Sequence, residues 1–291
     1  MDSDRMLDVL SRAANAIGER LVATNQWGLL ADSDHQHHSD LAADAAGLAV
    51  LHEADFSVLS EESGFTGRSD SESGFTGRSD NESGFTGRSD SESGFTGRSA
   101  GGNDSGITVV LDPLDGSTNA AHQLSWYATS LCAVDKDGPL AALVVNLVNG
   151  QRYEAVRGLG ARRDGRPIAP SGATMLAESF VGISALPPRN LGWSQFRCFG
   201  AAALDLCAVA DGRLDAFVDC GVDAHGVWDY LGAMLVCQEA GAVVADAWGR
   251  DLVVLEHGAR RTPVGASSQS VLDQLVEARA EAYEPMKGQE R

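Results

Sequence analysis

Apolar residues recur at two different spacings along this chain, and these spacings predict its helices and strands. Over residues 5–23 and 40–52 they recur every three or four positions, which predicts two amphipathic helices. Shorter apolar runs predict strands at 56–59, 107–111, 126–134, 140–148 and 152–156. In the second half, helices are predicted at 200–210, 228–239 and 271–283, with strands at 214–219 and 242–245. Mixed strands with helices before and after them indicate a layered fold of the α/β (α+β) class.

Residues 61–100 interrupt this pattern with four consecutive decapeptides that have neither helical nor strand periodicity. The four units read EESGFTGRSD, SESGFTGRSD, NESGFTGRSD and SESGFTGRSA. This biased composition is typical of a surface loop, and we interpret 64–100 as a loop insertion. Each unit also carries one Phe with an Arg three residues on, which leaves open a partner-binding role for Phe65, Phe75, Phe85 and Phe95.

The charge balance is strongly acidic, with 41 Asp and Glu against 22 Lys and Arg and a net charge of -19. Proteins that bind nucleic acid need a basic surface, so we expect no nucleic-acid partner, and the same sign disfavours an anionic membrane. The five cysteines are odd in number and form no CxxC pair, which is typical of a reducing compartment. The acidic N-terminus lacks the features of a signal peptide, and no apolar run reaches the length of a membrane span. We therefore expect a cytoplasmic protein.

The segment 112–118, Asp-Pro-Leu-Asp-Gly-Ser-Thr, carries the strongest chemical signal in the sequence. It follows the apolar run 107–111, so its two carboxylates come at the end of a predicted buried strand. Carboxylate oxygens suit hard cations such as Mg2+, which commonly bind substrate phosphate as well. The helix start expected after the Gly turn would offer backbone N–H groups to an anion. The segment therefore predicts a place that holds cations and a phosphate.

Two more carboxylates occupy comparable places in the predicted elements. Glu61 follows the strand at 56–59, and Asp229 begins the helix at 228–239. Taken alone, Asp229 could simply be a charge that stabilises the first helical turn, and Glu61 any carboxylate at the end of a strand. A cluster of His35, His37 and His38 could hold a transition metal or could belong to an ordinary solvated loop.

Three motifs together resemble the signatures of the inositol monophosphatase family, which comprises Mg2+-dependent, lithium-sensitive sugar phosphatases. They are Ser60-Glu61-Glu62-Ser63, the 112–118 segment with Asn119 after it, and Trp228-Asp229. Gly200-Ala201-Ala202-Ala203 is similar to the substrate loop of that family. The resemblance implies an αβαβα sandwich, in which helix layers alternate with mixed β-sheets, and a homodimer. It also implies one catalytic domain over 1–291, with a metal-site region at about 1–170 and a substrate-loop region at about 171–291.

The resemblance further implies roles for individual residues. The first metal would be held by Glu61, Asp112 and the backbone carbonyl of Leu114. A second metal would be held by Asp112, Asp115 and Asp229. The attacking water would be oriented by Ser117, and phosphate would meet the backbone donors of Gly116, Ser117 and Thr118. Further substrate contacts are implied for Ala201, Ala202, Asp219 and Asp229. Asp44 matches an outer acidic position that could help to hold a third metal.

The repeats bear directly on these assignments. Glu61 and Asp112 stand 51 positions apart, and removing three decapeptides would leave 21, which is close to the spacing typical of the family. Only the first unit has Glu at the ligand position, because the later units have Ser71, Asn81 and Ser91 there. We therefore assign the ligand to Glu61.

The sequence thus predicts a Mg2+-dependent phosphomonoesterase, with inositol monophosphate or a similar small polyol phosphate as its substrate. Hydrolysis would use a water molecule activated by metal, with no covalent enzyme intermediate. Phosphatases of histidinol phosphate, fructose 1,6-bisphosphate or nucleotide 3'-phosphates are open alternatives, since the substrate loop does not decide between them. Outside the enzymes, the alternative is a binding or regulatory protein that uses the repeat loop.

Overall fold

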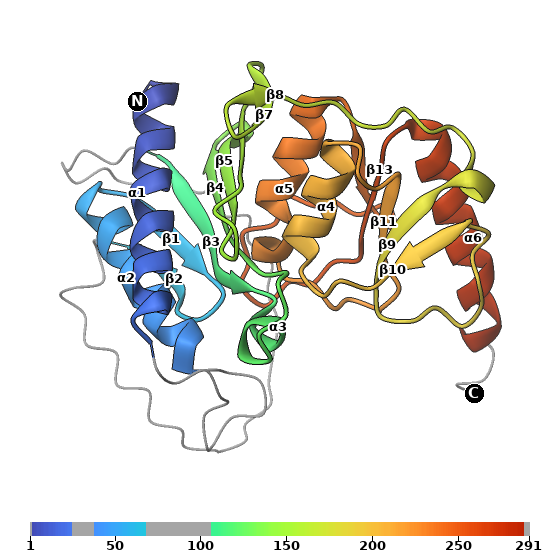
Figure 1. Ribbon diagram of the computed structural model, residues 1–291, viewed down its shortest axis with the longest axis horizontal. Coiled ribbons are helices and arrows are strands. Elements are labelled where there is room, and N and C mark those ends of the chain that lie inside the picture. The colour runs from blue at the N-terminus through green and yellow to red at the C-terminus, as the bar shows by residue number, and fades with distance from the viewer. Residues whose placement is uncertain (1, 25–37, 68–105, 288–291) are drawn as a thin grey trace, which may run out of the picture.

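The computed structural model describes residues 2–24, 38–67 and 106–287 of the chain. These residues form five layers, in which helices alternate with two β-sheets (Figure 1). Helices α1 (Ser3–Val22) and α2 (His38–Glu53) form one outer layer. Helices α4 (Ala202–Ala210) and α5 (Val227–Ala240) lie between the sheets, and α6 (Gln269–Lys287) covers the far side. The predicted αβαβα arrangement is confirmed.

The first sheet has eight strands in the order β2-β1-β3-β4-β5-β6-β7-β8. Their bounds are Gly64–Thr66 for β2, Ser57–Ser60 for β1, Thr108–Asp115 for β3, Ala128–Asp135 for β4, Gly138–Asn146 for β5, Arg152–Val156 for β6, Gly160–Arg163 for β7 and Arg166–Pro167 for β8. Only β1 and β3 run parallel among these neighbours. Asn149-Gly150 lies between β5 and β6, as the hairpin signal predicted.

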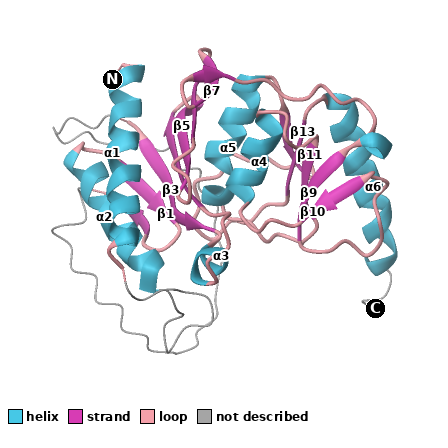
Figure 2. Ribbon diagram, in the orientation of Figure 1, coloured by secondary structure: helices cyan, strands magenta, loops and turns pink. Residues whose placement is uncertain are grey.

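The second sheet has five strands in the order β10-β9-β11-β13-β12, and Figure 2 shows both sheets in magenta between the helix layers. Its bounds are Gln195–Arg197 for β10, Phe180–Ser184 for β9, Ala216–Asp219 for β11, Pro263–Ala266 for β13 and Val243–Asp246 for β12. Strand β9 runs parallel to both β10 and β11, whereas β13 is antiparallel to its neighbours. The sheet is therefore mixed, as expected from the sequence.

The interpretation of 64–100 as a loop is wrong at its beginning. Gly64–Thr66 form β2, which pairs antiparallel with β1 and places Phe65 opposite Leu59. Phe and Thr favour pleated, half-buried backbone, and the exposed edge of β1 offers them a partner. The rest of this interpretation, and the proposed partner role of Phe75, Phe85 and Phe95, lie outside the described residues.

Apolar side chains fill the spaces between the layers. One cluster lies where α1 and α2 cover the first sheet, and includes Leu10, Ile17 and Leu111. A second surrounds α4 and α5, with Leu206 and Leu231 fully buried. A third joins the second sheet to α6 through residues such as Val264 and Leu275. Burial of this apolar surface is the main favourable contribution to folding. The packing also fixes where the ends of the strands lie.

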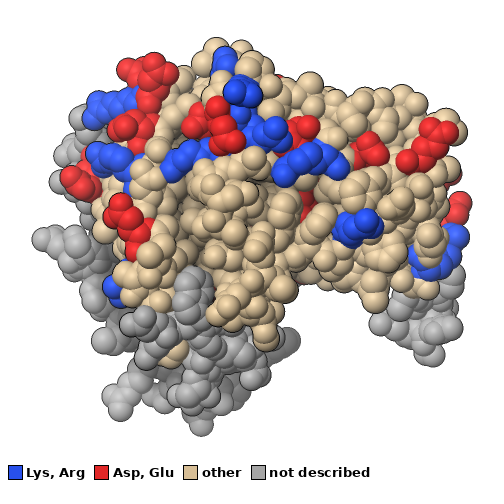
Figure 3. All heavy atoms as spheres, in the orientation of Figure 1, with Lys and Arg blue, Asp and Glu red and all other residues tan. Residues whose placement is uncertain are grey.

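Acidic and basic side chains lie mixed on the face of the molecule seen in Figure 3, so the acidic excess forms no uniform field there. None of the described helices is long and apolar enough to cross a membrane.

Candidate active site

A bulge at the end of β3 brings Asp112 and Asp115 together. Side chains three positions apart on a regular strand point to opposite faces of a sheet. Here the register against β4 shifts between these two residues, and such a bulge re-aims the side chains that follow it. The N–H of Leu114 donates to Oδ1 of Asp112 at 3.0 Å, which holds the bulged backbone in place. Both carboxylates therefore reach the same space.

Strand β1 delivers Glu61 to the same end of the sheet. Because β1 is parallel to β3, with Ser60 opposite Leu111, the residues that follow each pair are also neighbours. The N–H of Glu61 donates to the carbonyl of Leu111 at 3.1 Å, so this residue continues the pairing beyond the strand. Behind it, the buried carboxylate of Asp44 accepts hydrogen bonds from the hydroxyls of Ser60 and Ser63. These contacts fix the turn that carries Glu61.

Helix α5 contributes Asp229 from its first turn. One carboxylate oxygen accepts from the N–H of Gly226 at 2.7 Å and caps the helix. Ligand atoms of Asp112, Asp115 and Asp229 all lie within 4.8 Å of one another. Asp229 therefore does both things that the sequence left open: it stabilises the first turn of α5, and it belongs to the acidic cluster. Glu61 is not a member of this trio, but its carboxyl group lies within hydrogen-bonding reach of Asp112 and its charge acts on that residue.

Ionisation of the trio and of Glu61 is costly, because these four carboxyl groups are largely shielded from water and lie close to one another. Burial raises the pKa of Asp112 well above its ordinary value, and the charges of Glu61, Asp115 and Asp229 raise it further. Burial and Asp229 raise the pKa of Asp115 to about 7. The pKa of Glu61 rises for the same reasons, with burial first and the charge of Asp229 second. Such a cluster favours protons or cations in its midst.

The donor set fits a hard divalent cation. Oδ2 of Asp112 is buried and has no hydrogen-bond donor, which is a costly state for a carboxylate oxygen unless a cation satisfies it. The three aspartates supply oxygen ligands only, as Mg2+ or Ca2+ prefers, and no Cys or His belongs to the trio. The residues present therefore match a bound Mg2+.

The backbone after Asp115 turns sharply toward the second half of the chain. Gly116 has φ 83°, in the left-handed region, and precedes the short helix α3 (Ser117–Ala121). A Cβ on Gly116 would stand 3.1 Å from the carbonyl oxygens of Gly200 and Trp126. Only glycine meets both demands, and its bare backbone brings the first turn of α3 beside the loop that contains Gly200.

Asp115 also caps α4. Its Oδ2 accepts from the N–H of Ala203 at 2.8 Å, while the cap residue Ala201 provides no side-chain acceptor itself. An acidic group at a helix start is stabilised by the helix dipole. Asn119, three residues beyond Gly116 in α3, donates to the carbonyls of Trp126 and Phe199 at 2.8 and 2.7 Å. Sequence reasoning gave Asn119 no role, because a positioning amide has no periodic signature.

Comparison with known proteins shows the family of the chain. The sequence model of the inositol monophosphatase family matches residues 81–284, more than half of the chain. The chain belongs to this family. The match begins within the repeats, so Glu61 lies before it and owes its placement to the pairing of β1 with β3.

Named relatives of this family member support the assignment. The Nus factor SuhB of Salmonella typhimurium is 33% identical over 162 residues, which cover 51% of this chain and 60% of the relative. A fructose-1,6-bisphosphatase/inositol-1-monophosphatase of Methanocaldococcus jannaschii is 30% identical over 183 residues, or 60% of this chain and 71% of the relative. The chain thus spans about 60% of the length of the first of these relatives. A solved inositol monophosphatase from Anabaena shares the fold, with TM-score 0.69, 24% identity and 98% coverage of both chains.

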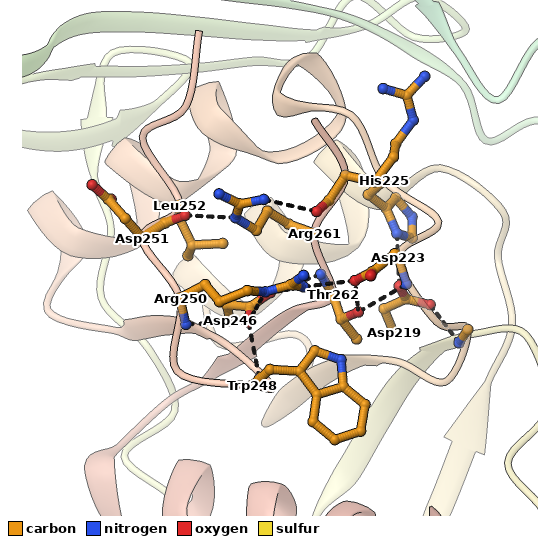
Figure 4. A network of polar contacts seen from close by, with 12 residues as sticks. Asp219, Asp223, His225, Asp246, Trp248, Arg250, Asp251, Leu252, Arg261 and Thr262 are labelled. Atoms are coloured by element: carbon orange, nitrogen blue, oxygen red, sulfur yellow. Dashed lines mark hydrogen bonds and ion pairs between the residues drawn. The ribbon is translucent and has the colours of Figure 1, made fainter. Parts of the chain in front are cut away.

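The family's expected substrate carboxylate, Asp219, is fully buried in this member at the end of β11. Its Oδ1 accepts from the N–H of Gly221 at 2.7 Å, and its Oδ2 lies 3.0 Å from Nδ1 of His225 (Figure 4). The side chain of His225 is 12% exposed. Burial lowers the pKa of His225, but the hydrogen bond to Asp219 and the charges of Asp229, Asp219 and Asp115 outweigh it and raise the pKa to about 9. Sequence reasoning missed His225, since a single His in a loop gives no signal.

The remaining expected site residues lie around the acidic trio with different exposure. Leu114 is buried in the bulge, Ser117 is half-buried and Thr118 is exposed. Ala201 and Ala202 are buried at the start of α4. Their predicted contacts with metal or substrate stay predictions. His38 is exposed at the start of α2, whereas His35 and His37 lie outside the described residues.

Proposed function

We propose that this chain is a Mg2+-dependent phosphomonoesterase acting on inositol monophosphate or a similar small polyol phosphate. The observation that supports it best is the trio Asp112, Asp115 and Asp229, whose ligand atoms lie within 4.8 Å beside the turn at Gly116. The proposed cation site would then adjoin the backbone N–H groups proposed to bind the phosphoryl group. Membership of the family agrees with this proposal. The proposed domain is a single unit, with metal ligands mainly before residue 170 and the substrate loop after it.

Each residue would contribute through its own position. Glu61, Asp112, the carbonyl of Leu114, Asp115 and Asp229 would hold Mg2+, which lowers the pKa of water and stabilises charge on a leaving oxygen. The backbone N–H groups of Gly116, Ser117 and Thr118 would bind and orient the phosphoryl oxygens. The hydroxyl of Ser117 would position the attacking water. The start of α4, with Ala201 and Ala202, and the ring of His225 would meet the polyol. Asp219, whose oxygens are bonded to Gly221 and His225, would hold that ring in place.

The experiment that tests this proposal measures phosphate release from inositol 1-phosphate with and without Mg2+. We expect release only with the metal, and loss of at least about 100-fold in kcat for Asp115→Asn, because one anionic ligand is removed. Asn retains a carbonyl oxygen that can still cap α4, so the fold should survive. Asp137→Asn, at an exposed turn, is the matched control and should behave as the wild type. Full activity of Asp115→Asn would refute the role given to the trio.

The assembly and location of the protein are part of the same proposal. A small phosphorylated polyol is the partner that the site favours. We infer a homodimer from the family resemblance, and a cytoplasmic location from the features of the sequence given above. The described cysteines are free rather than paired, which agrees with a reducing compartment. The mass in solution, measured by light scattering, tests the dimer.

A further inference from the structure

A loop between β12 and β13 contacts Glu61 and Trp228, the residue before Asp229, and it carries Arg260. Nε2 of His257 lies 3.0 Å from the carbonyl oxygen of Glu61, and its ring centroid is 4.9 Å from that of Trp228. The guanidinium carbon of Arg260 is 5.0 Å from the centroid of the same indole. Trp228 directly precedes Asp229. The loop therefore reaches both the β1 side and the α5 side of the site.

Arg260 acts electrostatically on this site without forming an ion pair in it. Burial raises the pKa of Asp229, while His225, the N–H of Gly226 and then Arg260 lower it. Yet no carboxylate of the described residues lies within ion-pair distance of Arg260. Its Nη1 donates to the carbonyls of His257 and Ala259 at 2.8 and 2.9 Å. These bonds fix the side chain, and within the described part of the chain no hydrogen-bond acceptor is paired with Nε or Nη2.

Neighbouring arginines show the contrast. Arg250 binds Asp246 and Asp223, and Arg261 donates to the carbonyls of Asp251 and Arg260 (Figure 4). Arg279 is buried and donates to the carbonyls of Asp219 and Gly221. These three arginines use two or more of their nitrogens in bonds that hold neighbouring backbone or carboxylates in place. Among the described residues, Arg260 is bonded through Nη1 alone, so its Nε and Nη2 donors can bind an external anion.

The backbone around Arg260 is held rigidly toward the site. Arg261 and His225 exchange two backbone hydrogen bonds, 2.8 Å from the N–H of Arg261 and 3.2 Å from that of His225. This bridge ties the loop to the turn that leads into Asp229. Stacking on Trp228 restrains the planar head group as well. Arg260 is therefore preorganised, and little entropy is lost when it binds a ligand.

We propose that Arg260 recognises a second anionic group on the substrate, at a distance from the phosphoryl group that is hydrolysed. This inference rests on the proposed phosphatase function and adds a preference, among its phosphate monoester substrates, for those that carry another phosphate or a carboxylate. The planar guanidinium binds both groups through two parallel N–H donors. A neutral polyol would gain nothing from this contact.

The test compares matched substrates that differ in the second anion only. 3-Phosphoglycerate is paired with glycerol 3-phosphate, and fructose 1,6-bisphosphate with fructose 1-phosphate, each at saturating Mg2+. For the wild type, kcat/KM should be higher for the doubly anionic member of at least one pair. Arg260→Ala should lower that preference on the order of 10- to 100-fold, while kcat/KM for the singly phosphorylated member changes less than about threefold. Arg260→Lys should keep more of the preference than Arg260→Ala does, because lysine retains the positive charge but lacks the two parallel N–H donors of the guanidinium.

The controls separate this role from a structural one. Arg189→Ala removes an exposed arginine that pairs with Glu281, and it should leave every ratio unchanged. If Arg260 only supports Trp228 or Asp229, Arg260→Ala lowers both members of a pair equally, and the inference is overturned. A wild type that prefers neither doubly anionic substrate also overturns it. Loss confined to the bisphosphate pair assigns a phosphate, and loss confined to the other pair a carboxylate. If the wild type hydrolyses none of these esters or inositol 1-phosphate with Mg2+, the proposed function itself fails.

Discussion

Single residues set the geometry of this site through their backbone as much as through their charge. Gly116 combines a left-handed φ of 83° with close approach to two carbonyl oxygens, and Asp112 keeps a buried oxygen without a donor. The sequence predicted an acidic site of Glu61, Asp112, Asp115 and Asp229 from their places after apolar runs or at a helix start and from the family motifs. The structure brings the three aspartates within 4.8 Å of one another. The sequence could not identify His225, Arg260 or Asn119. Their roles depend on contacts across the fold, such as the bond between Asn119 and Phe199, which no local pattern records.

Replacement of Gly116 by Ala tests the backbone requirement. The added Cβ would meet carbonyl oxygens at 3.1 Å and would need an unfavourable φ. We expect a loss of stability of about 2–4 kcal/mol and a fall in kcat of at least about 100-fold, measured by chemical denaturation and phosphate release. Gly150→Ala is the matched control, since Gly150 has φ 75° but open space around its Cβ position. It should lose only about 1–2 kcal/mol and keep its activity. Equal effects of the two variants would contradict the close-approach argument.

Apolar spacing in the sequence predicted the long helices and strands but missed several of the short strands. The amphipathic helices at 5–23 and 40–52 correspond to α1 and α2, and Arg152–Val156 is found as predicted. Strands β7, β8, β9, β10 and β13 were not predicted, since several are only two to four residues long and β13, Pro-Val-Gly-Ala, lacks alternation. Strand β3 extends through Asp115, beyond the predicted end at 111, because pairing with β4 continues across the bulge. Tertiary pairing overrode the local signal.

The connection between β1 and β3 should tolerate a change of length. Deleting residues 71–100 removes three repeat units and leaves Glu61, β2 and β3 in the chain. The variant should keep its activity within about twofold. It should also gain about 1 kcal/mol of stability, because two halvings of a loop each recover about 0.6 kcal/mol of closure entropy. Activity assays and urea denaturation check this expectation. Loss of Mg2+-dependent activity in a folded variant would show that Glu61 is not the ligand assigned here.

The whole molecule joins two sheets through the helices between them, and the acidic site lies where these parts meet. Glu61 and Asp112 come from the first sheet, whereas Asp229 begins α5 and Asp115 caps α4. The layered class and the family were predictable from the order of elements and three motifs. The relative placement of the layers was not, because it depends on three apolar clusters whose members are scattered along the chain.

Metal binding and pH should be linked through the stability of the whole fold. The pKa of Asp115 is 3.8 in its ordinary state and about 7 in the folded protein without metal. The folded state therefore holds this proton more tightly, and its contribution to stability is full below pH 3.8 and lost as pH rises through 7. Without metal, Tm should fall between pH 5 and pH 8. Saturating Mg2+ should raise Tm by about 5–10 °C at pH 8 and much less at pH 5.

Scanning fluorimetry of the protein treated with EDTA, before and after Mg2+ is added back, measures this linkage. Asp115→Asn is the informative variant, because its side chain does not titrate and its Tm should depend less on pH. A metal-free Tm that stays constant or rises from pH 5 to pH 8 would argue against the raised pKa.

Trp228 gives this protein an optical property that follows from its surroundings. The indole is buried, stacks near His257 and Arg260, and adjoins Asp229 in the chain. Any ligand that draws Arg260 or Asp229 toward itself changes the charge beside this fluorophore, and its emission shifts accordingly. The chain thus carries a fluorophore next to Asp229, and replacing its other four tryptophans would isolate that signal. Occupancy could be followed in real time even with compounds that never react.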